Sequence, residues 1–379
     1  MKEVVIQNFE KVFGKKPQLI VKAPGRVNLI GEHTDYNGGL VLPAAIDKYV
    51  WMAFSETTGK AITIQAIDLD QKVELNIDNL STEIGWARFF TGILIKIKKD
   101  YNLPDGLNVS FTSNIPVGAG MSSSSAIECA FLYGINRLFE LFLSNDELIQ
   151  ISKWSNHNIL GIKGGIMDQF TSLNGREDQC IFLDCYFNKA KYIKLNLAEY
   201  SFVLFDTKVK HEHATGEYNL RPKECKEALS IIRKGNKDIE YISQLRNKDL
   251  EEIEMPAILK KRVEFVIEEN RRVLQFVDQI YSQDFIKMGK LLYESHEGLS
   301  KKYEVSCDEL DFLVSQTQGN EYILGARMMG GGFGGCTLNL IKSEHRDEVI
   351  YQVKKQYKDK FQIEMESYPV KIVNGISIA

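Results

Sequence analysis

A polar segment from Gly25 to Gly39 carries residue types well suited to bind a small molecule rich in hydroxyl groups. Its sequence, GRVNLIGEHTDYNGG, places one arginine, two carboxylates, one imidazole and two amides between glycines. The apolar run 18–23 before it predicts a strand, and Pro24 with Gly25 predicts where that strand ends. We therefore expect the polar side chains on a turn and the following loop, where binding residues are commonly placed. The alternative is an ordinary turn, because Gly, Asn and Asp also favour turns.

A second segment, residues 115–126, predicts a phosphate site. Its sequence, IPVGAGMSSSSA, directly precedes a run with helical apolar spacing, so its serines fall at the start of a helix. Unpaired N–H groups and the helix dipole favour an anion there, glycines let the backbone approach closely, and serine hydroxyls donate hydrogen bonds or bind Mg²⁺. The alternative is a serine N-cap after a flexible turn. The chain has no Gly-x-x-x-x-Gly-Lys-Ser/Thr motif, which argues against a Walker-type NTPase.

Asp168 is a third candidate, because it follows a glycine turn and lies among apolar neighbours. The run 161–170 reads GIKGGIMDQF. A carboxylate in apolar surroundings needs a charged partner, and Arg26 is the arginine that we expect to pair with it. The alternative, a surface aspartate that ends a turn, is equally compatible with this segment alone.

A glycine-rich run at 330–335, GGGFGG, satisfies the Gly-x-Gly-x-x-Gly pattern of dinucleotide-binding proteins. That motif must open a helix, whereas the residues that follow here, 336–341, have a strand-like sequence. We therefore reject a dinucleotide site and expect the run to pack closely against a ligand or another loop.

The elements that must position these segments are mixed strands and helices in both halves of the chain. Strand-like runs occur at 41–50, 61–67, 107–111 and 202–206. A helix is predicted by apolar residues at three- and four-residue spacing, namely Ile127, Ala130, Phe131, Ile135, Leu138, Phe139 and Phe142. A longer helix is predicted after Pro256, with one face made of Leu259, Val263, Val266, Ile267, Leu274, Val277 and Tyr281. The pattern indicates an α+β fold in two domains, residues 1–200 and 201–379.

Length and charge limit the class of partner. A chain of 379 residues exceeds what one core normally serves, which supports two domains. Its 47 basic and 51 acidic residues give a net charge of −4, which argues against nonspecific binding to nucleic acid or to an anionic membrane. We therefore expect small-molecule partners, and neither the charge nor the composition predicts the oligomeric state.

The chain shows no signal for export, membrane insertion or a zinc motif. Charges interrupt the first eleven residues and no apolar run is long enough to span a bilayer, so we expect a cytoplasmic protein. Six scattered cysteines without a Cys-x-x-Cys pair predict buried reduced thiols. The run His211-Glu212-His213 lacks the spacing of the metalloprotease zinc motif.

Taken in order along the chain, the segments described above resemble the three motifs of the GHMP small-molecule kinases. The segment 25–39 resembles the galactokinase signature almost residue for residue. Further similar stretches occur at 217–221, 224–225, 295–296 and 305–311. The resemblance therefore covers nearly the whole chain. It implies a two-domain α+β architecture with the active site between the domains. It also implies transfer of the γ-phosphoryl group of ATP to the anomeric hydroxyl of α-D-galactose.

The same resemblance assigns an expected role to each segment. Arg26 and Asp168 would carry out the chemistry, with the arginine holding the aspartate ionised. The residues expected to bind the sugar are Glu32, His33, Asp35, Gly165, Asp168 and Tyr218, of which Asp35 and Glu32 are expected to select it. The residues expected to hold the phosphates of ATP are Pro116, Gly118, Gly120, Ser122, Ser123, Ser124 and Ser125.

One departure from the family pattern concerns the metal. Galactokinases usually carry a glutamate twelve residues before the catalytic aspartate, and Asn156 stands there in this chain. An amide oxygen binds Mg²⁺ without adding negative charge, so we expect Ser124 and Asn156 to hold the metal more weakly. Gly164 also replaces a usual cysteine, and Met329 replaces a usual threonine.

Two alternative functions stay open at this point. The acceptor could be N-acetylgalactosamine or another galactose-like sugar, because the sequence does not show the pocket around the 2-hydroxyl. The chain could instead be a sugar and nucleotide sensor without turnover, since pocket residues alone do not prove chemistry. Asn156 is the only support for that second alternative.

Overall fold

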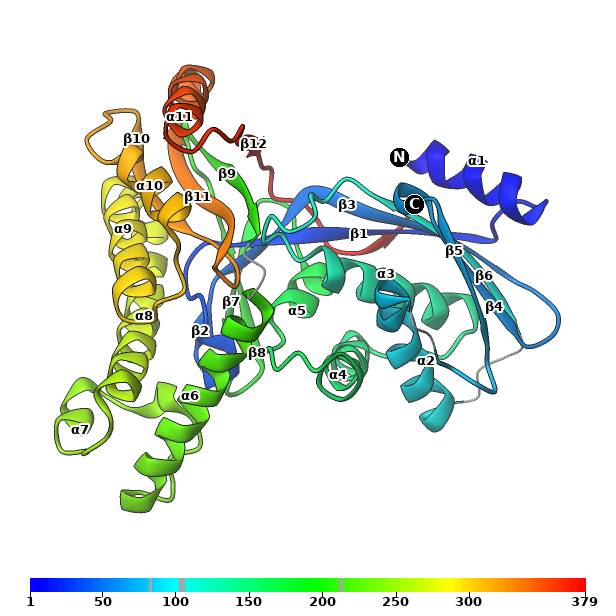
Figure 1. Cartoon of the computed structure of the whole chain (residues 1–379), viewed down its shortest axis with the longest axis horizontal. Coiled ribbons are helices and arrows are strands. Elements are labelled where there is room, and N and C mark those ends of the chain that lie inside the picture. The colour runs from blue at the N-terminus through cyan, green and yellow to red at the C-terminus, as the bar shows by residue number, and fades with distance from the viewer. Residues whose placement is uncertain (82–83, 102–105, 211–213) are drawn as a thin grey trace.

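The computed structural model shows two α+β halves arranged along an elongated molecule (Figure 1). It describes residues 1–81, 84–101, 106–210 and 214–379, so the His211-Glu212-His213 run lies outside the described residues. Within these described ranges, no helix combines the length and apolar character needed to cross a lipid bilayer.

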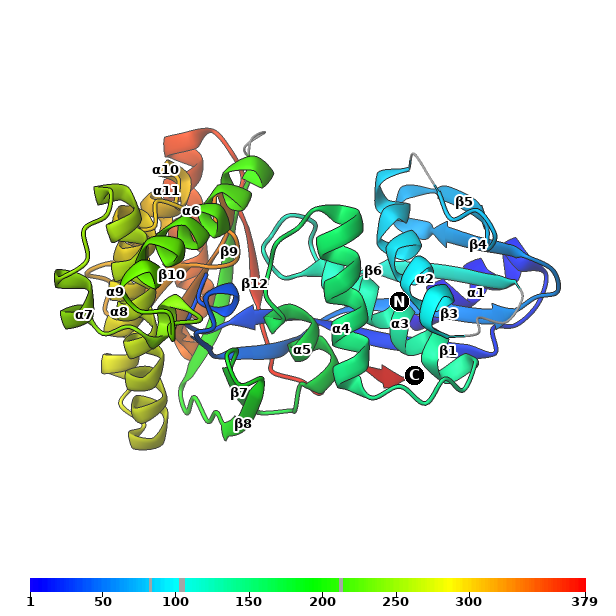
Figure 2. The same cartoon turned by 90° about the horizontal axis from the view of Figure 1, so that it is seen from below.

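The first half is built on a six-stranded sheet with the order β13-β1-β3-β6-β4-β5. All pairs are antiparallel except β4 with β6. The C-terminal strand pairs with β1, so the end of the chain returns to the first half (Figure 2). The strands are β1 (Leu19–Asn28), β3 (Pro43–Glu56), β4 (Ala61–Ala66), β5 (Gln71–Asn76), β6 (Leu107–Ser113) and β13 (Ser377–Ile378).

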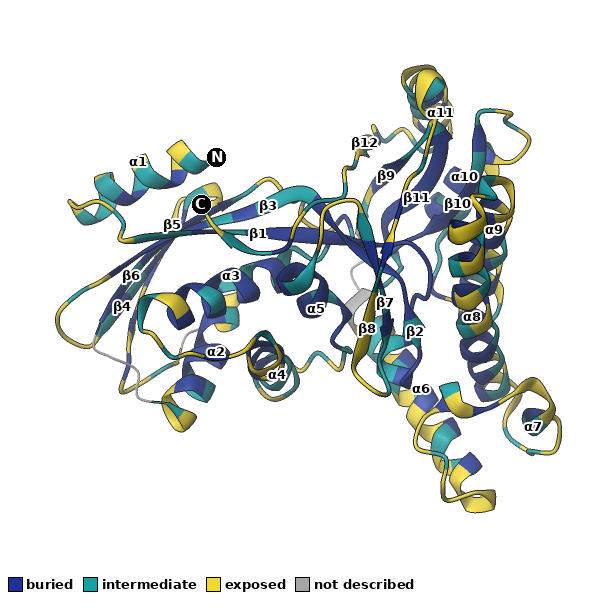
Figure 3. Ribbon diagram, turned by 180° about the vertical axis from the view of Figure 1, so that it is seen from behind, coloured by how far each residue is buried: buried dark blue, intermediate teal, exposed yellow. Residues whose placement is uncertain are grey.

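Helices cover both faces of this sheet. The helix α1 (Lys2–Phe13) lies on one face, and the other face carries α2 (Arg88–Asp100), α3 (Ser123–Leu138), α4 (Asn145–Ser155) and α5 (Met167–Asn174) (Figure 1). The α3 helix is buried around most of its circumference, as Figure 3 shows. Its Phe131 ring packs 4.8 Å from Phe90 of α2 and 6.3 Å from Phe54 of β3, measured between ring centroids. These contacts place α3 at the centre of the core.

The predicted helix at 127–142 is correct in position but wrong at its end. The structure ends α3 at Leu138, and Phe142 is 87% exposed rather than buried. Glu140 and Phe142 both have positive φ angles, 49° and 56°, so the chain turns there instead of continuing the helix.

The second half contains a four-stranded antiparallel sheet with the order β10-β11-β9-β12. Its strands are β9 (Tyr200–Lys210), β10 (Ile323–Met328), β11 (Gly334–Lys342) and β12 (Glu366–Pro369). The helices of this half are α6 (Ala214–Gly235), α7 (Asn247–Glu251), α8 (Ala257–Ser282), α9 (Phe285–Lys301), α10 (Asp308–Thr317) and α11 (Arg346–Phe361). Because β9 begins at Tyr200, it starts next to the predicted domain boundary, which itself stays a prediction.

The long helix α8 begins directly after Pro256, as predicted, but its apolar face is only partly the predicted one. Leu259, Val263 and Val266 are buried, whereas Leu274 and Tyr281 are exposed. The second part of α8 carries two overlapping apolar stripes, and packing in the folded protein buries the stripe that contains Val273, Phe276 and Ile280. Helical spacing alone could not choose between the two stripes.

A small three-stranded sheet lies beside the end of β1. It contains β2 (Leu40–Val41), β7 (Gln179–Asp184) and β8 (Lys189–Lys194), in the order β2-β7-β8. The backbone N–H of Cys185 donates to the carbonyl of Gly39 at 3.0 Å. This contact anchors the end of the polar segment that begins at Gly25.

Candidate active site

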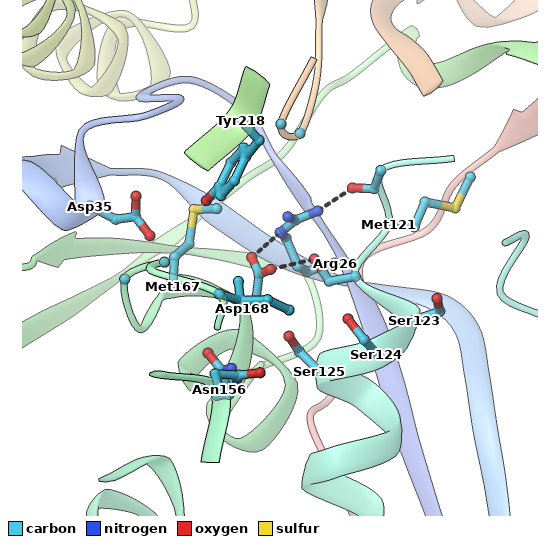
Figure 4. A pocket seen from close by; sticks show the side chains of 18 of the residues that line it. Arg26, Asp35, Met121, Ser123, Ser124, Ser125, Asn156, Met167, Asp168 and Tyr218 are labelled. Carbon is cyan, nitrogen blue, oxygen red and sulfur yellow. Dashed lines mark hydrogen bonds and ion pairs between the residues drawn. The ribbon is translucent and has the colours of Figure 1, made fainter. Parts of the chain in front are cut away.

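A cavity of about 400 Å³ lies where the four predicted segments, 25–39, 115–126, 161–170 and 330–335, meet (Figure 4). Its walls come from the end of β1 and the loop after it, the serine-rich segment, the residues around Asp168, the helix α6, and the glycine-rich run before β11. Every residue predicted for the sugar, phosphate or metal lines this cavity, namely Arg26, Glu32, His33, Asp35, Pro116, Gly118, Gly120, Ser122, Ser123, Ser124, Ser125, Asn156, Gly165, Asp168 and Tyr218. The predicted convergence of distant segments is therefore confirmed.

Arg26 lies on a strand and not on a turn, which corrects the sequence prediction. Strand β1 continues through Pro24 and Gly25 to Asn28, with a register irregularity between Pro24 and Arg26. At that irregularity the Arg26 N–H donates to the carbonyl of Met121 instead of to a strand partner. A Cβ at Gly25 would lie 2.7 Å from the same carbonyl oxygen, so glycine allows the serine-rich segment to approach the strand.

Arg26 and Asp168 form the predicted ion pair. The Nε of Arg26 donates to Asp168 Oδ1 at 2.7 Å, and its Nη1 donates to the carbonyl of Gly120. Burial opposes the charge of the guanidinium, but the carboxylates of Asp168 and Glu32 raise the pKa of Arg26. The arginine thus stays charged, and it links the predicted catalytic carboxylate to the predicted phosphate loop.

Ser122 forms a second hydrogen bond to Asp168, and this bond leaves the start of α3 without the expected serine cap. Its hydroxyl donates to Asp168 Oδ2 at 2.7 Å, and its backbone has a φ of 58°. Because the hydroxyl points to Asp168, α3 has no side-chain cap on its first N–H groups. The N-cap alternative for this serine is therefore wrong, and the positive end of α3 is left open toward the cavity.

The other end of the cavity holds Asp35, Gly165 and Tyr218. A Cβ at Gly165 would overlap Oδ2 of Asp35 and lie 2.5 Å from its Cγ, so only glycine lets these two residues approach so closely. Burial, and secondarily the charge of Asp168, raises the pKa of Asp35 from 3.8 to about 7. Burial also raises the pKa of Tyr218. Both side chains therefore offer hydrogen-bonding groups in a weakly hydrated wall.

His33 is held as a neutral imidazole. Its Nδ1 lies 2.8 Å from the hydroxyl of Tyr36, which in turn lies 2.9 Å from the hydroxyl of Tyr303. Burial and the nearby charge of Arg221 lower the pKa of His33 to about 3. A neutral ring has one donor and one acceptor nitrogen, which suits it to a hydroxyl ligand.

The raised pKa of Asp35 predicts a pH dependence of stability. Between about pH 4 and pH 7 the folded state keeps a proton that the unfolded state has lost, so stability falls as the pH rises. The slope from one such group is at most about 1.4 kcal/mol per pH unit. We expect Asp35→Asn to flatten the curve of unfolding free energy against pH in this window, measured by urea titration at pH 5, 6, 7 and 8. Equal slopes in both proteins would contradict the proton assignment.

Glu32 is tied to the glycine-rich run through a residue that sequence reasoning missed. Its Oε1 accepts from the N–H of Gly330 at 2.8 Å and from Nη2 of Arg327 at 3.2 Å. Arg327 is fully buried on β10 and also donates to the carbonyls of Leu29, Asn28 and Met328. A single arginine in a strand carries no motif, so only the folded contacts identify it.

The glycine-rich run behaves as predicted, packing backbone against backbone. A Cβ at Gly330 would lie 3.1 Å from Cα of Gly120, and one at Gly332 would overlap the carbonyl of Val305. The strand β11 begins at Gly334. The run therefore joins the serine-rich segment to the second half and is not a dinucleotide motif.

Asn156 has a partner that the sequence did not predict. Its Nδ2 donates to Oε2 of Glu128 at 3.0 Å, and the Ser152 hydroxyl donates to the same oxygen. Glu128 lies on α3, where its position among apolar residues gave no functional signal. Lys153 and His157 also line the cavity, three residues before Asn156 and one residue after it.

The chain shares the fold and motif regions of a known class of kinases. Residues 88–176 match the family model of the GHMP kinases N terminal domain, and residues 276–359 match that of the GHMP kinases C terminal region. The structure of the Methanococcus jannaschii mevalonate kinase is similar with a TM-score of 0.65 at 20% identity, over 94% of this chain and 98% of that one. These matches, with the serine-rich segment at the start of α3, define a GHMP-type kinase fold.

Further matches identify the family within this class of kinases. Residues 7–56 match the galactokinase galactose-binding signature. A galactokinase of Thermotoga neapolitana is 40% identical over 94% of this chain and 99% of its own length, and one of Enterococcus faecalis is 36% identical over 99% of both. The crystal structure of Lactococcus lactis galactokinase complexed with galactose is similar with a TM-score of 0.95 at 29% identity, over 100% of this chain and 99% of that one. The chain belongs to the galactokinase family.

Proposed function

We propose that this protein transfers the γ-phosphoryl group of ATP to the anomeric hydroxyl of α-D-galactose, giving galactose 1-phosphate and ADP. The observation that carries the proposal is the contact of Arg26 with Asp168 inside a cavity whose walls hold all the predicted binding residues. The match to the galactose-binding signature supports galactose as the acceptor. ATP is the phosphoryl donor expected of a GHMP kinase.

The sugar is proposed to lie between the loop after β1 and α6. Asp35, Glu32, His33 and Tyr218 provide carboxylates, an imidazole and a phenol from different sides. A hydroxyl of the wrong epimer leaves buried polar groups unpaired, which costs about 1 to 3 kcal/mol for each group. Asp35 is our main candidate for selecting the sugar, because Gly165 fixes the space around its carboxylate.

The phosphates of ATP are proposed to lie at the start of α3. The side chains of Ser123, Ser124 and Ser125 lie at the start of α3 beside the cavity (Figure 4), and the glycines before the helix also line it. The first N–H groups of α3 have no side-chain cap. The end of the cavity beside α3 is electrostatically suited to an anion because of the helix dipole and the charge of Arg26.

The residues at this end also suit Mg²⁺. Mg²⁺ prefers oxygen ligands and is commonly held by few protein groups together with substrate phosphates and water. The hydroxyl of Ser124 and Oδ1 of Asn156 are such oxygens, and no cluster of three or more His, Cys, Asp or Glu residues suited to a metal occurs in the described chain. When bound, Mg²⁺ would neutralise charge on the phosphates. We expect ATP to supply most of its ligands here.

Asp168 and Arg26 are proposed to act through position and charge. Asp168 would accept a hydrogen bond from the anomeric hydroxyl, orient it toward the γ-phosphate and take its proton late in a loose transition state. Arg26 would keep the carboxylate ionised and offset negative charge on the transferring group. Ser122 holds the second carboxylate oxygen, so the aspartate has little freedom to turn away.

Gly165→Ala is expected to raise the KM for galactose about tenfold or more, since a misplacement of about 1 Å in a site has effects of this size. The new methyl group would overlap the Asp35 carboxylate and displace it. Steady-state kinetics with saturating ATP test this. Gly164→Ala is the matched control, because its Cβ would meet only the Tyr218 hydroxyl at 3.6 Å. Equal KM values in the two variants would contradict the proposed role of Asp35.

An ADP-release assay with ATP, Mg²⁺ and a panel of sugars tests the function itself. We expect turnover with galactose and little with glucose, its 4-epimer. Preference for N-acetylgalactosamine would support the alternative acceptor. Galactose binding without ADP release would support a sensor and contradict the proposed reaction.

We also propose a cytoplasmic location. All six cysteines are unpaired thiols, and burial raises the pKa of several of them, including Cys129 and Cys336. Unpaired, inert thiols fit a reducing compartment.

A further inference from the structure

Glu128 is a buried carboxylate directly behind the wall of the cavity. Its side chain lies on α3 and the residue is 1% exposed. Among the described residues it forms no ion pair with Lys, Arg or His, and its partners are neutral donors from neighbouring helices. A buried carboxylate is costly unless such donors satisfy it, which raises the question of what it does here.

The contacts of Glu128 lead to the proposed metal residue. Its Oε2 accepts from the Ser152 hydroxyl and from Nδ2 of Asn156, whereas its Oε1 has no hydrogen-bond partner among the described residues. Asn156 is the proposed metal residue. Glu128 therefore anchors the part of the cavity wall that carries this residue.

The contact with Glu128 sets the direction of the Asn156 amide. Nδ2 of Asn156 donates to Oε2 of Glu128 at 3.0 Å, so the NH₂ group and not the carbonyl lies against the carboxyl group. The oxygen of Glu128 accepts this hydrogen bond, and only the NH₂ group of an amide can donate one. With Nδ2 held by Glu128, Oδ1 is the side-chain polar atom that Asn156 can offer to the cavity that it lines. An amide turned the other way would present NH₂, which cannot bind a cation.

We propose that Glu128 is a positioning residue that fixes the Asn156 amide so that its oxygen faces Mg²⁺. In this arrangement Asn156 supplies the neutral oxygen ligand, and Glu128 holds the NH₂ group of the same amide away from the metal. The inference rests on the proposed function, since it assumes that the metal binds beside Asn156.

Binding of Mn²⁺ in the presence of ADP, followed by the electron paramagnetic resonance signal of free Mn²⁺, tests this without catalysis. We expect Glu128→Gln to weaken Mn²⁺ binding about 10- to 100-fold, as changes behind metal ligands commonly do. The new amide can donate to Oδ1 of Asn156 and turn it away from the cavity. The double variant Glu128→Gln with Asn156→Asp should bind at least as tightly as the unmodified protein, because the amide introduced on α3 would then donate to a carboxylate that faces the metal.

Two controls separate positioning from general damage. Ser152→Ala removes a donor to the same carboxylate oxygen but leaves the contact with Asn156, so we expect Mn²⁺ affinity close to that of the unmodified protein. Equal losses in Ser152→Ala and Glu128→Gln, or no recovery in a folded double variant, would overturn the inference. Thermal unfolding establishes that each variant is folded.

Asn156→Ala distinguishes this inference from the proposed metal site. If Asn156→Ala weakens Mn²⁺ binding and Glu128→Gln does not, the positioning role is wrong and the metal site stands. If Asn156→Ala binds Mn²⁺ as tightly as the unmodified protein, the metal assignment fails and the positioning role fails with it.

Discussion

Asp168→Asn is expected to lower kcat by about 10²- to 10⁴-fold, the range typical for loss of a general base. Asparagine keeps the shape of the side chain but loses the charge that pairs with Arg26 at 2.7 Å and the ability to accept a proton. Galactose affinity should fall at most about tenfold, because one hydrogen bond contributes about 0.5 to 1.5 kcal/mol. Steady-state kinetics give kcat, and calorimetry with galactose alone gives the affinity.

Arg26→Ala should cause a comparable loss of turnover, since it removes the charge beside the transferring group. Asp70→Asn is the matched control for Asp168→Asn, and we expect it to keep a normal kcat. Asp70 is exposed, and its left-handed backbone suits asparagine. A near-normal kcat in Asp168→Asn or Arg26→Ala would remove that residue from the catalytic role.

Arg327→Met is expected to destabilise the fold by about 3 to 5 kcal/mol, the usual cost of removing one partner from a buried ion pair. The guanidinium is completely buried and bonds to Glu32 and to three backbone carbonyls from β1, the loop after it and β10. Methionine fills part of the volume but leaves the Glu32 carboxylate with Gly330 as its remaining partner on Oε1. Urea unfolding followed by circular dichroism measures the change.

Arg346→Met supplies the comparison for this stability prediction. Arg346 pairs with Asp347 at the surface, so its loss should change the stability by less than about 1 kcal/mol. Similar unfolding free energies for Arg327→Met and Arg346→Met would contradict the large stabilisation that we assign to the buried arginine.

Sequence reasoning found the site because most of its residues, though not Asn156 and Tyr218, cluster in three short segments with distinctive chemistry. The serine-rich segment predicted the start of α3, and the apolar setting of Asp168 predicted a charged partner, which the structure confirms as Arg26. These predictions depend on local spacing and on the cost of burying charge, and both are visible in the sequence.

The features that were missed depend on contacts between distant segments. Pro24 and Gly25 normally end a strand, but the approach of the serine-rich segment lets β1 continue past them. Ser122 has the sequence of an N-cap, yet Asp168 draws its hydroxyl away. Arg327 and Glu128 have no local signal at all, because their partners lie on other elements.

A crystal structure of the unmodified protein with galactose and a nonhydrolysable ATP analogue tests the proposed reaction most directly. We predict that the anomeric oxygen lies within about 2.6 to 3.2 Å of the Asp168 carboxylate, as a general base requires. We also predict that the γ-phosphate lies at the start of α3, beside Ser122 to Ser125. A galactose whose anomeric hydroxyl points away from Asp168, or a triphosphate outside the serine-rich segment, would contradict it.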